Sequence, residues 1–420
     1  MSDRAYRHRL EADIARWQAD GVITAAAADV IRSRLPPVPE GVTVATVVAI
    51  VGGILIAAAF LAFVAANWTA IARPVRFAML LAGIAGAYVI GASFDHMKRP
   101  YLADLAVAAG SIIFGAAIAL VGQMYHLGED FAVGMLLWAT GALVAAALTG
   151  SRGALAVALV TACIWNGMRV FEIGDIHLPF VAFWLIAAGL AVIWNAAAAR
   201  HLVAIAAVVW CVHSAIGLDL ARQANPFFTV SAAASLLLGG GLALASRGPQ
   251  SRRALGLALS NYGAIALAIA LASIVAGIEG IRATPDQPAW VLGCGVAGVI
   301  LAFAATVLDR RPGSALAGVA TALALLVGSG WIRPSGLDDP WLVYALALGS
   351  MLCLVVSGML DGVRPRVVAG WIGLALVIAA VTWAVRGSLL RRAAFLAAAG
   401  LVAVGLATML GRLLGKERAQ

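Results

Sequence analysis

Charged residues are scarce in this sequence: they make up 12% of its 420 residues, while 63% are hydrophobic. A soluble domain typically carries roughly 25% charged residues, so a water-facing surface over most of the chain is excluded. Alternating polar and apolar segments, which a membrane barrel needs, are also lacking. The apolar residues instead form continuous runs of roughly twenty, each long enough to cross a bilayer as a helix.

Residues that commonly mark an enzyme or a redox site are few. The four cysteines, Cys163, Cys211, Cys294 and Cys353, all fall inside apolar runs, so neither a disulfide framework nor a zinc spacing is visible. The sequence has no Gly-rich nucleotide loop, nucleophile elbow or zinc-protease motif. We therefore expect no cofactor, and catalysis is the least favoured class of function. No secretory signal is apparent, because about forty polar residues precede the first apolar run.

The apolar runs themselves contain almost no ionisable side chains. We find only Asp104, near the inner end of the third run, and His213, toward the outer end of the seventh. A proton-coupled carrier would normally place a carboxylate near the membrane midplane. The apparent lack of one argues against ion-coupled transport.

What is present predicts an all-α, polytopic transmembrane helical bundle of about fourteen spans. Residues 1–42 are expected to form a small cytoplasmic helical hairpin, with Gly21 ending its first helix and Thr24 capping its second. Residues 43–420 form the transmembrane domain. The expected spans are Val44–Ala66, Val75–Ser93, Leu102–Gly122, Phe131–Leu148, Gly153–Met168, Pro179–Asn195, His201–Leu218, Phe227–Ser246, Leu255–Gly280, Ala289–Leu308, Gly313–Trp331, Trp341–Met359, Val367–Val385 and Ala393–Gly411.

The distribution of basic residues predicts the orientation. When the N-terminus is placed in the cytoplasm, most of the 29 Lys and Arg residues fall on the inner side. This asymmetry is typical of multi-pass proteins, and it explains the net charge of +9 without a nucleic-acid partner. We expect a multi-pass membrane protein with both termini in the cytoplasm. The last outer loop, with Arg386, Arg391 and Arg392, is the exception to the asymmetry.

One outer loop concentrates reactive side chains. Between the third and fourth spans lie Gln123, Tyr125, His126, Glu129 and Asp130. One interpretation is a shallow substrate-binding pocket at the outer membrane boundary, with hydrogen-bonding and acid–base groups. The other is a polar hairpin in which Asp130 simply caps the fourth helix.

Two further segments could join this loop. Asn67 and Trp68, at the outer end of the first span, either face the same pocket or form a helix end with an interfacial aromatic residue. A second outer loop carries Glu172, Asp175 and His177. Their spacing is not diagnostic of metal ligands, so no metal site is predicted.

Several of these motifs resemble a bacterial family of polytopic membrane proteins catalogued as domain-of-unknown-function 2157. The resemblance rests on the hairpin with Trp17 and the Gly21–Thr24 turn, on the Gly122–His126 segment, on Leu137–Ala139, and on Asn67 with Trp68. It covers about the first 150 residues. It implies a membrane protein and carries no activity with it.

Two functions remain open from the sequence. The first is passage or flipping of a small or lipid-linked solute through an outward-facing cavity beneath the Gln123–Asp130 loop. The second is a non-transporting scaffold or sensor that signals through the N-terminal hairpin. The expected partners are membrane lipids and, through residues 1–42, a second copy of the chain or a cytoplasmic protein.

Overall fold

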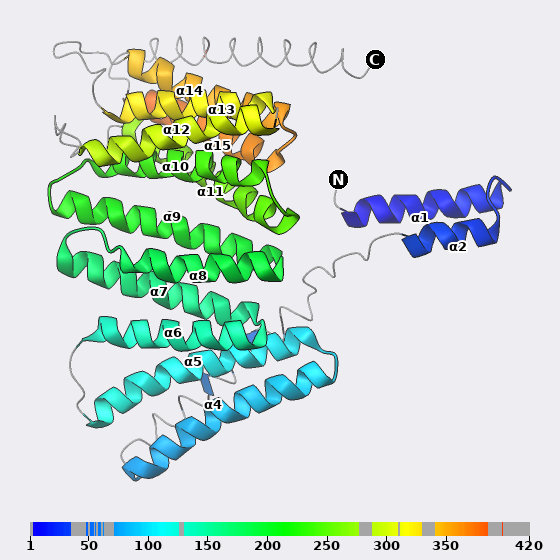
Figure 1. Ribbon diagram of the computed structural model, residues 1–420, viewed down its shortest axis with the longest axis vertical. Helices are drawn as coiled ribbons and strands as arrows, with labels where there is room; N and C mark the ends of the chain where they lie inside the picture. Colours follow the sequence, from blue (N-terminus) through cyan, green and yellow to red (C-terminus); the bar gives the residue numbers. More distant parts are fainter. Residues whose placement is uncertain are drawn as a thin grey trace. The chain divides into compact units, whose positions relative to one another are not determined.

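A computed structural model describes residues 3–34, 71–125, 130–276, 288–309, 311–329 and 341–384, with isolated residues at 48, 51–53, 55, 58, 59, 62 and 397. The side chains of residues 3–9, 341, 383 and 384 are not described. The longer elements of this part of the chain are all helices (Figure 1). They are α1 Asp3–Ala19, α2 Ala25–Arg34, α4 Arg73–His96, α5 Pro100–Tyr125, α6 Phe131–Thr149, α7 Arg152–Ile173, α8 Pro179–Trp194, α9 Ala197–Leu220, α10 Pro226–Ser246, α11 Gln250–Val275, α12 Ala289–Asp309, α13 Pro312–Ser329, α14 Trp341–Leu360 and α15 Arg364–Ala384.

The chain divides into two compact units, residues 1–63 and 64–420. In the first unit, α1 packs against α2 as a hairpin. Gly21 has a left-handed backbone with φ of 68°, and the Thr24 hydroxyl accepts a hydrogen bond from the Ala27 backbone N–H. Both predicted helix-end residues are thereby confirmed. Ile14 and Ala28 are fully buried, so the hairpin has a small apolar core. The predicted division at residue 42 stays a prediction.

The second unit confirms the transmembrane helical bundle. Twelve of the fourteen expected spans coincide with described helices, α4 through α15, and the first and last lie outside the described residues. Eleven of these helices are long and apolar enough to cross a membrane. The other is α8, which has only 16 residues and reaches roughly 24 Å. Side chains such as Leu148, Ile193 and Val307 are more than three-quarters exposed, which suits a surface that faces lipid.

Neighbouring helices approach closely because glycine and alanine dominate the contacts. The α10–α12 contact is the tightest: a Cβ added to Gly239 would overlap the backbone of Gly298, and one added to Gly298 would overlap that of Ser235. At the α5–α6 contact, the Trp138 indole lies over Gly115 and donates to the Ser111 carbonyl at 2.8 Å. Membrane helices associate through small residues that let their backbones pack closely, because in lipid there is no hydrophobic driving force between helices.

Asp104, one of the two ionisable residues predicted inside a span, has a structural role. Its Oδ1 accepts hydrogen bonds from the Ser151 hydroxyl at 2.6 Å and from the Gly153 backbone N–H at 3.0 Å. The carboxylate therefore ties α5 to the N-terminal end of α7, where the helix dipole favours a negative charge. This arrangement accounts for the acid without an ion path.

The glycine contact between α10 and α12 can be tested by substitution. We expect Gly298→Leu to lower the melting temperature of the purified protein strongly, because overpacking typically costs about 1–3 kcal/mol and here the obstacle is backbone. Gly293→Leu, on the same helix, is the matched control, since a Cβ there meets nothing within 4 Å. Equal melting temperatures for the two variants would contradict this packing.

Candidate functional site

The predicted outer loop is only partly described. Gln123 and Tyr125 are exposed at the C-terminal end of α5, whereas Asn67, Trp68, His126 and Glu129 lie outside the described residues. Asp130 is exposed and accepts a hydrogen bond from the Val133 backbone N–H at 3.1 Å. The helix-capping role of Asp130 is therefore confirmed, and the pocket beneath the loop stays a prediction.

Asp130 also joins the second predicted loop through Arg169 on α7. The Arg169 guanidinium donates to Asp130 Oδ2 at 2.8 Å and to Glu172 Oε2 at 2.6 Å. The guanidinium holds the pKa of the Asp130 carboxyl below its usual value, and the backbone bond from Val133 acts in the same direction. Because Arg169 bridges two carboxylates, neither acid is left as an isolated charge.

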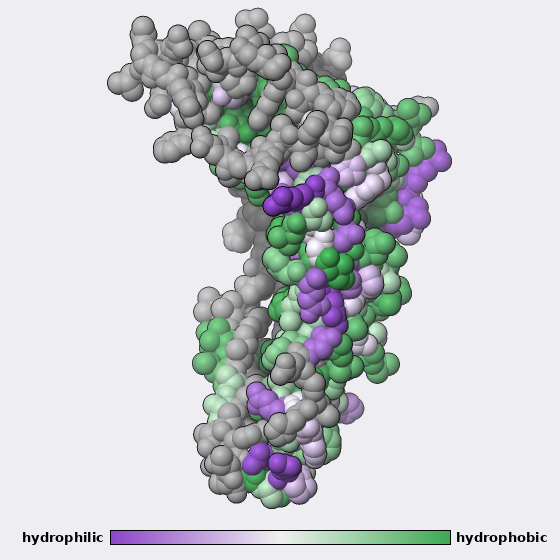
Figure 2. All heavy atoms as spheres, turned by 90° about the vertical axis from the view of Figure 1, so that its left-hand side faces the viewer, coloured by the Kyte–Doolittle hydropathy of each residue, from purple (hydrophilic) through white to green (hydrophobic). Residues whose placement is uncertain are grey.

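We call this side of the bundle the Asp130 end; it also holds the turns at residues 174–178 and 221–225. Figure 2 looks at the ends of the helices on this side, where hydrophilic residues form a band flanked by hydrophobic ones. Exposed polar residues here include Asp130, Glu172, Asp175, Arg222 and Gln223. A polar band bordered by apolar surface is the pattern expected where helices leave a membrane.

His177 does not join its loop neighbours Glu172 and Asp175. Asp175 accepts a hydrogen bond from the backbone N–H of Ile176 at 2.6 Å, while the His177 side chain is buried. Among the residues that the structure describes, no three His, Cys, Asp or Glu side chains gather in a way that could hold a metal ion. The His177 imidazole is therefore buried, whereas Glu172 and Asp175 are exposed.

Asn166 on α7 connects His177 to His213 on α9. Asn166 Oδ1 lies 3.3 Å from His177 Nδ1, and Asn166 Nδ2 lies 3.0 Å from His213 Nδ1. An amide oxygen only accepts and an amide nitrogen only donates. With the Asn166 amide in this orientation, His177 donates from Nδ1 and Nδ1 of His213 accepts. We call these three residues the His–Asn–His bridge.

The surroundings hold the bridge in place. Asn166 is fully buried, and the Trp165 ring meets the His177 ring edge-on with centroids 4.5 Å apart. The Trp210 indole donates to the His177 carbonyl at 3.3 Å. Gly167 leaves room for the His213 ring, which a Cβ at that position would crowd. Burial lowers the pKa of His177, and the nearby Arg169 lowers it further.

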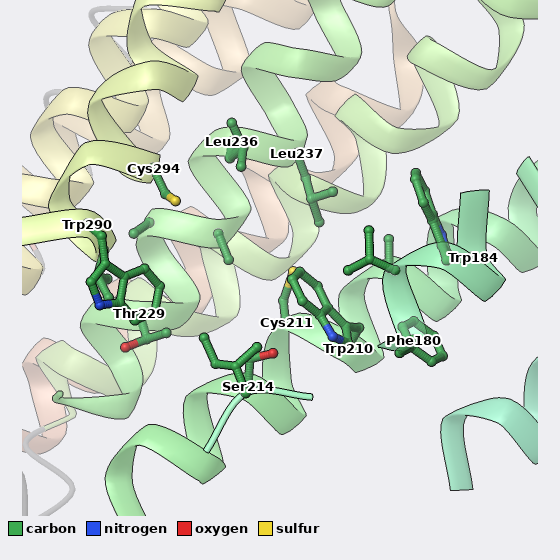
Figure 3. A pocket seen from close by; sticks show the side chains of 16 residues that line it. Phe180, Trp184, Trp210, Cys211, Ser214, Thr229, Leu236, Leu237, Trp290 and Cys294 are labelled. Carbon is green, nitrogen blue, oxygen red and sulfur yellow. The ribbon is translucent and has the colours of Figure 1, made fainter. Parts of the chain in front are cut away.

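Two pockets lie against different faces of α9. The tryptophan pocket, of about 210 Å³, lies among α8, α9, α10 and α12, and Trp184, Trp210 and Trp290 form part of its wall (Figure 3). The α7–α9 pocket, of about 510 Å³, includes His213 and Gly167 in its lining. His213 faces one pocket and its neighbour Ser214 the other.

Comparison with known proteins extends only to the first part of the chain. A family model described as "Predicted membrane protein (DUF2157)" matches residues 15–155. The resemblance found from the hairpin and from the Gly122–His126 segment is thereby confirmed over this range. No curated protein and no solved structure matches the chain. The His–Asn–His bridge and the tryptophan pocket lie beyond the matched residues.

The lowered pKa of His177 predicts a pH dependence of stability. A group whose folded-state pKa is below its unfolded value, about 6.5 for histidine, stabilises fully above that value and progressively less as the pH falls through the folded pKa. We therefore expect the melting temperature to decrease between pH 7.5 and 5.5, and His177→Asn to remove most of that decrease.

His201→Asn provides the control, because His201 is exposed near the N-terminal end of α9, whereas His213 of the bridge lies toward its C-terminal end. It should retain the pH dependence of the unmodified protein. A His177→Asn variant whose melting temperature depends on pH as that of the unmodified protein does would show that His177 is not the titrating group.

Proposed function

We propose that this multi-pass membrane protein binds a lipid-like or lipid-linked solute and passes it between the two sides of the bilayer. The observation that carries the proposal is the His–Asn–His bridge, which joins the turn after α7 to α9 through the buried Asn166 and ends at His213 in the lining of the α7–α9 pocket. Polar groups are costly within a membrane and usually line a substrate path or the interior of a bundle.

The two sides of α9 suit the two parts of an amphipathic solute. The tryptophan pocket offers apolar walls, while the α7–α9 pocket offers the imidazole of His213. Because Nδ1 of His213 is occupied by Asn166, Nε2 is the ring nitrogen left for a polar group. A solute with an apolar chain and a polar head could thus use both pockets as it moves past α9.

The predicted loop keeps a place in this proposal. Gln123, Tyr125, His126, Glu129 and Asp130, with Asn67 and Trp68, are proposed to contact the solute where it enters or leaves. The Asp130 end is proposed to face the outside, with both termini in the cytoplasm of a bacterial inner membrane.

The alternative is a non-transporting scaffold or sensor. Its support is the separate hairpin unit, on which Val22 and Val30 are more than half exposed and Trp17 is 39% exposed. Such apolar surface could meet a second copy of the chain or a cytoplasmic protein. A folded protein that moves no solute would favour this alternative.

Flipping can be measured with vesicles that contain the purified protein and a fluorescent phosphatidylcholine analogue, using an impermeant quencher added outside. We expect the protein to accelerate loss of the protected fluorescence. Asn166→Leu should slow flipping by about tenfold, equivalent to ~1.4 kcal/mol in the barrier, because both histidines lose their partner.

Thr161→Val is the matched control on the same helix. Thr161 is buried and polar, but its hydroxyl bonds only to the Val157 and Ala158 carbonyls of its own helix. It should flip lipid at the unmodified rate. If vesicles with and without protein behave alike, or if Asn166→Leu matches Thr161→Val, the proposed function is wrong.

A further inference from the structure

We propose that the tryptophan pocket seats an acyl chain of a membrane glycerolipid, with the Ser214 hydroxyl donating a hydrogen bond to the ester carbonyl. This inference rests on the proposed function, because it names the class of molecule that the protein would bind. It concerns one pocket, whose lining residues are all described.

Ser214 is the first indication of a ligand. Its side chain is only 5% exposed, and its Oγ has no hydrogen-bond partner among the described residues. Other buried serines in these helices bond to a carbonyl of the preceding turn, as Ser231 does to Phe227 and Ser235 to Ser231. A buried hydroxyl without a partner is unfavourable, so it favours a molecule that supplies an acceptor. The oxygen lies beneath the apolar surface of the pocket, and it reaches such an acceptor when the side chain turns about χ1.

The remaining lining requires that the rest of this molecule be apolar. The second hydroxyl in the wall, that of Thr229, donates to the Asn225 carbonyl at 3.1 Å. The indole N–H groups of Trp184 and Trp210 are bonded to the Val203 and His177 carbonyls. These groups are occupied by the protein itself, and the lining contains no charged side chain.

The dimensions and position of the pocket fit part of a lipid. A dry apolar cavity of about 150 Å³ accommodates benzene, so about 210 Å³ accepts a stretch of chain rather than a whole molecule. In Figure 3, Ser214 lies at one edge, with Thr229 and Trp290 to one side and Trp210 to the other. Ser214 is six residues, roughly 9 Å, from the end of α9. Ser214 therefore lies in the half of α9 that is nearer the Asp130 end.

Photo-crosslinking tests directly whether an acyl chain occupies the tryptophan pocket. The purified protein would be placed in bilayers that contain phosphatidylcholine with a diazirine in its acyl chain, and adducts would be mapped by mass spectrometry. We expect adducts within Trp210–Ser214, although Cys211 and Ser214 are buried. Adducts at Ile193, which is 77% exposed, report ordinary lipid contact and serve as the internal reference.

Three variants test which contacts hold the acyl chain. Ala233→Phe fills the pocket and should lower the adducts within Trp210–Ser214 at least fivefold, while those at Ile193 stay constant. Ala182→Phe, an exposed position on α8 outside the lining, should leave both unchanged. Ser214→Ala keeps the space but removes the donor, and should lower the adducts about threefold.

The outcomes separate this inference from the proposed function. An absence of adducts within Trp210–Ser214, or equal effects of Ala233→Phe and Ala182→Phe, would overturn the acyl seat, even if the protein flips lipid. Preferential labelling by a polyprenyl diazirine probe would overturn the choice of an acyl chain. Specific adducts in a protein that flips no lipid would leave the seat standing and remove the proposed function.

Discussion

A polar side chain inside a membrane-spanning helix must find its partners within the protein, because hydrocarbon offers none. Most such groups in the described helices obey this constraint. Asp104 binds the start of α7. Asp361, in the turn after α14, forms an ion pair with Arg366 of α15 at 2.8 Å, with both side chains 1% exposed. Asn166 holds two histidines at once. Ser214 Oγ, Asn261 Oδ1 and Arg366 Nε have no partner among the described residues, and Ser214 lines the tryptophan pocket.

The same constraint separates structural from functional candidates. The Asp104 and Asp361 carboxylates both bind the N-terminal end of another helix: Asp104 the Gly153 N–H of α7, and Asp361 the Gly313 N–H of α13. Their bonds hold helices together and need no solute. The His–Asn–His bridge instead joins a turn at the Asp130 end to the α7–α9 interface, with a pocket on each side of α9. The two carboxylates are therefore assigned a structural role, and His213 is the stronger candidate for contact with a solute.

Local signals in the sequence were sufficient for the helices and for several of their ends. The caps at Thr24 and Asp130 follow from residue type and position alone. Contacts between distant residues could not be predicted, because Asn166 and His213 meet only when α7 packs on α9. Helix boundaries also differ: the expected span began at Leu255, whereas α11 begins five residues earlier, at Gln250.

Burial likewise gives the charged residue Arg366 a different role from the one that the sequence indicates. Arg366 precedes the expected span Val367–Val385, so the sequence places it in a loop, but its side chain is buried against Asp361 and Ser357. A sequence cannot distinguish a solvated arginine from one paired inside a helix contact, since both have apolar neighbours. The two pockets escaped prediction for a similar reason, because their walls come from several helices and no single segment contains them.

The central claim is that the Asp130 end faces away from the cytoplasm, and cysteine labelling tests it most directly. In a background without the four native cysteines, Asp175→Cys and Gln250→Cys would each be exposed on intact cells to a membrane-impermeant maleimide. The account predicts that position 175 is labelled at once and position 250 only after the cells are permeabilised. The reverse pattern would place the bridge and both pockets at the cytoplasmic side and contradict the proposed route.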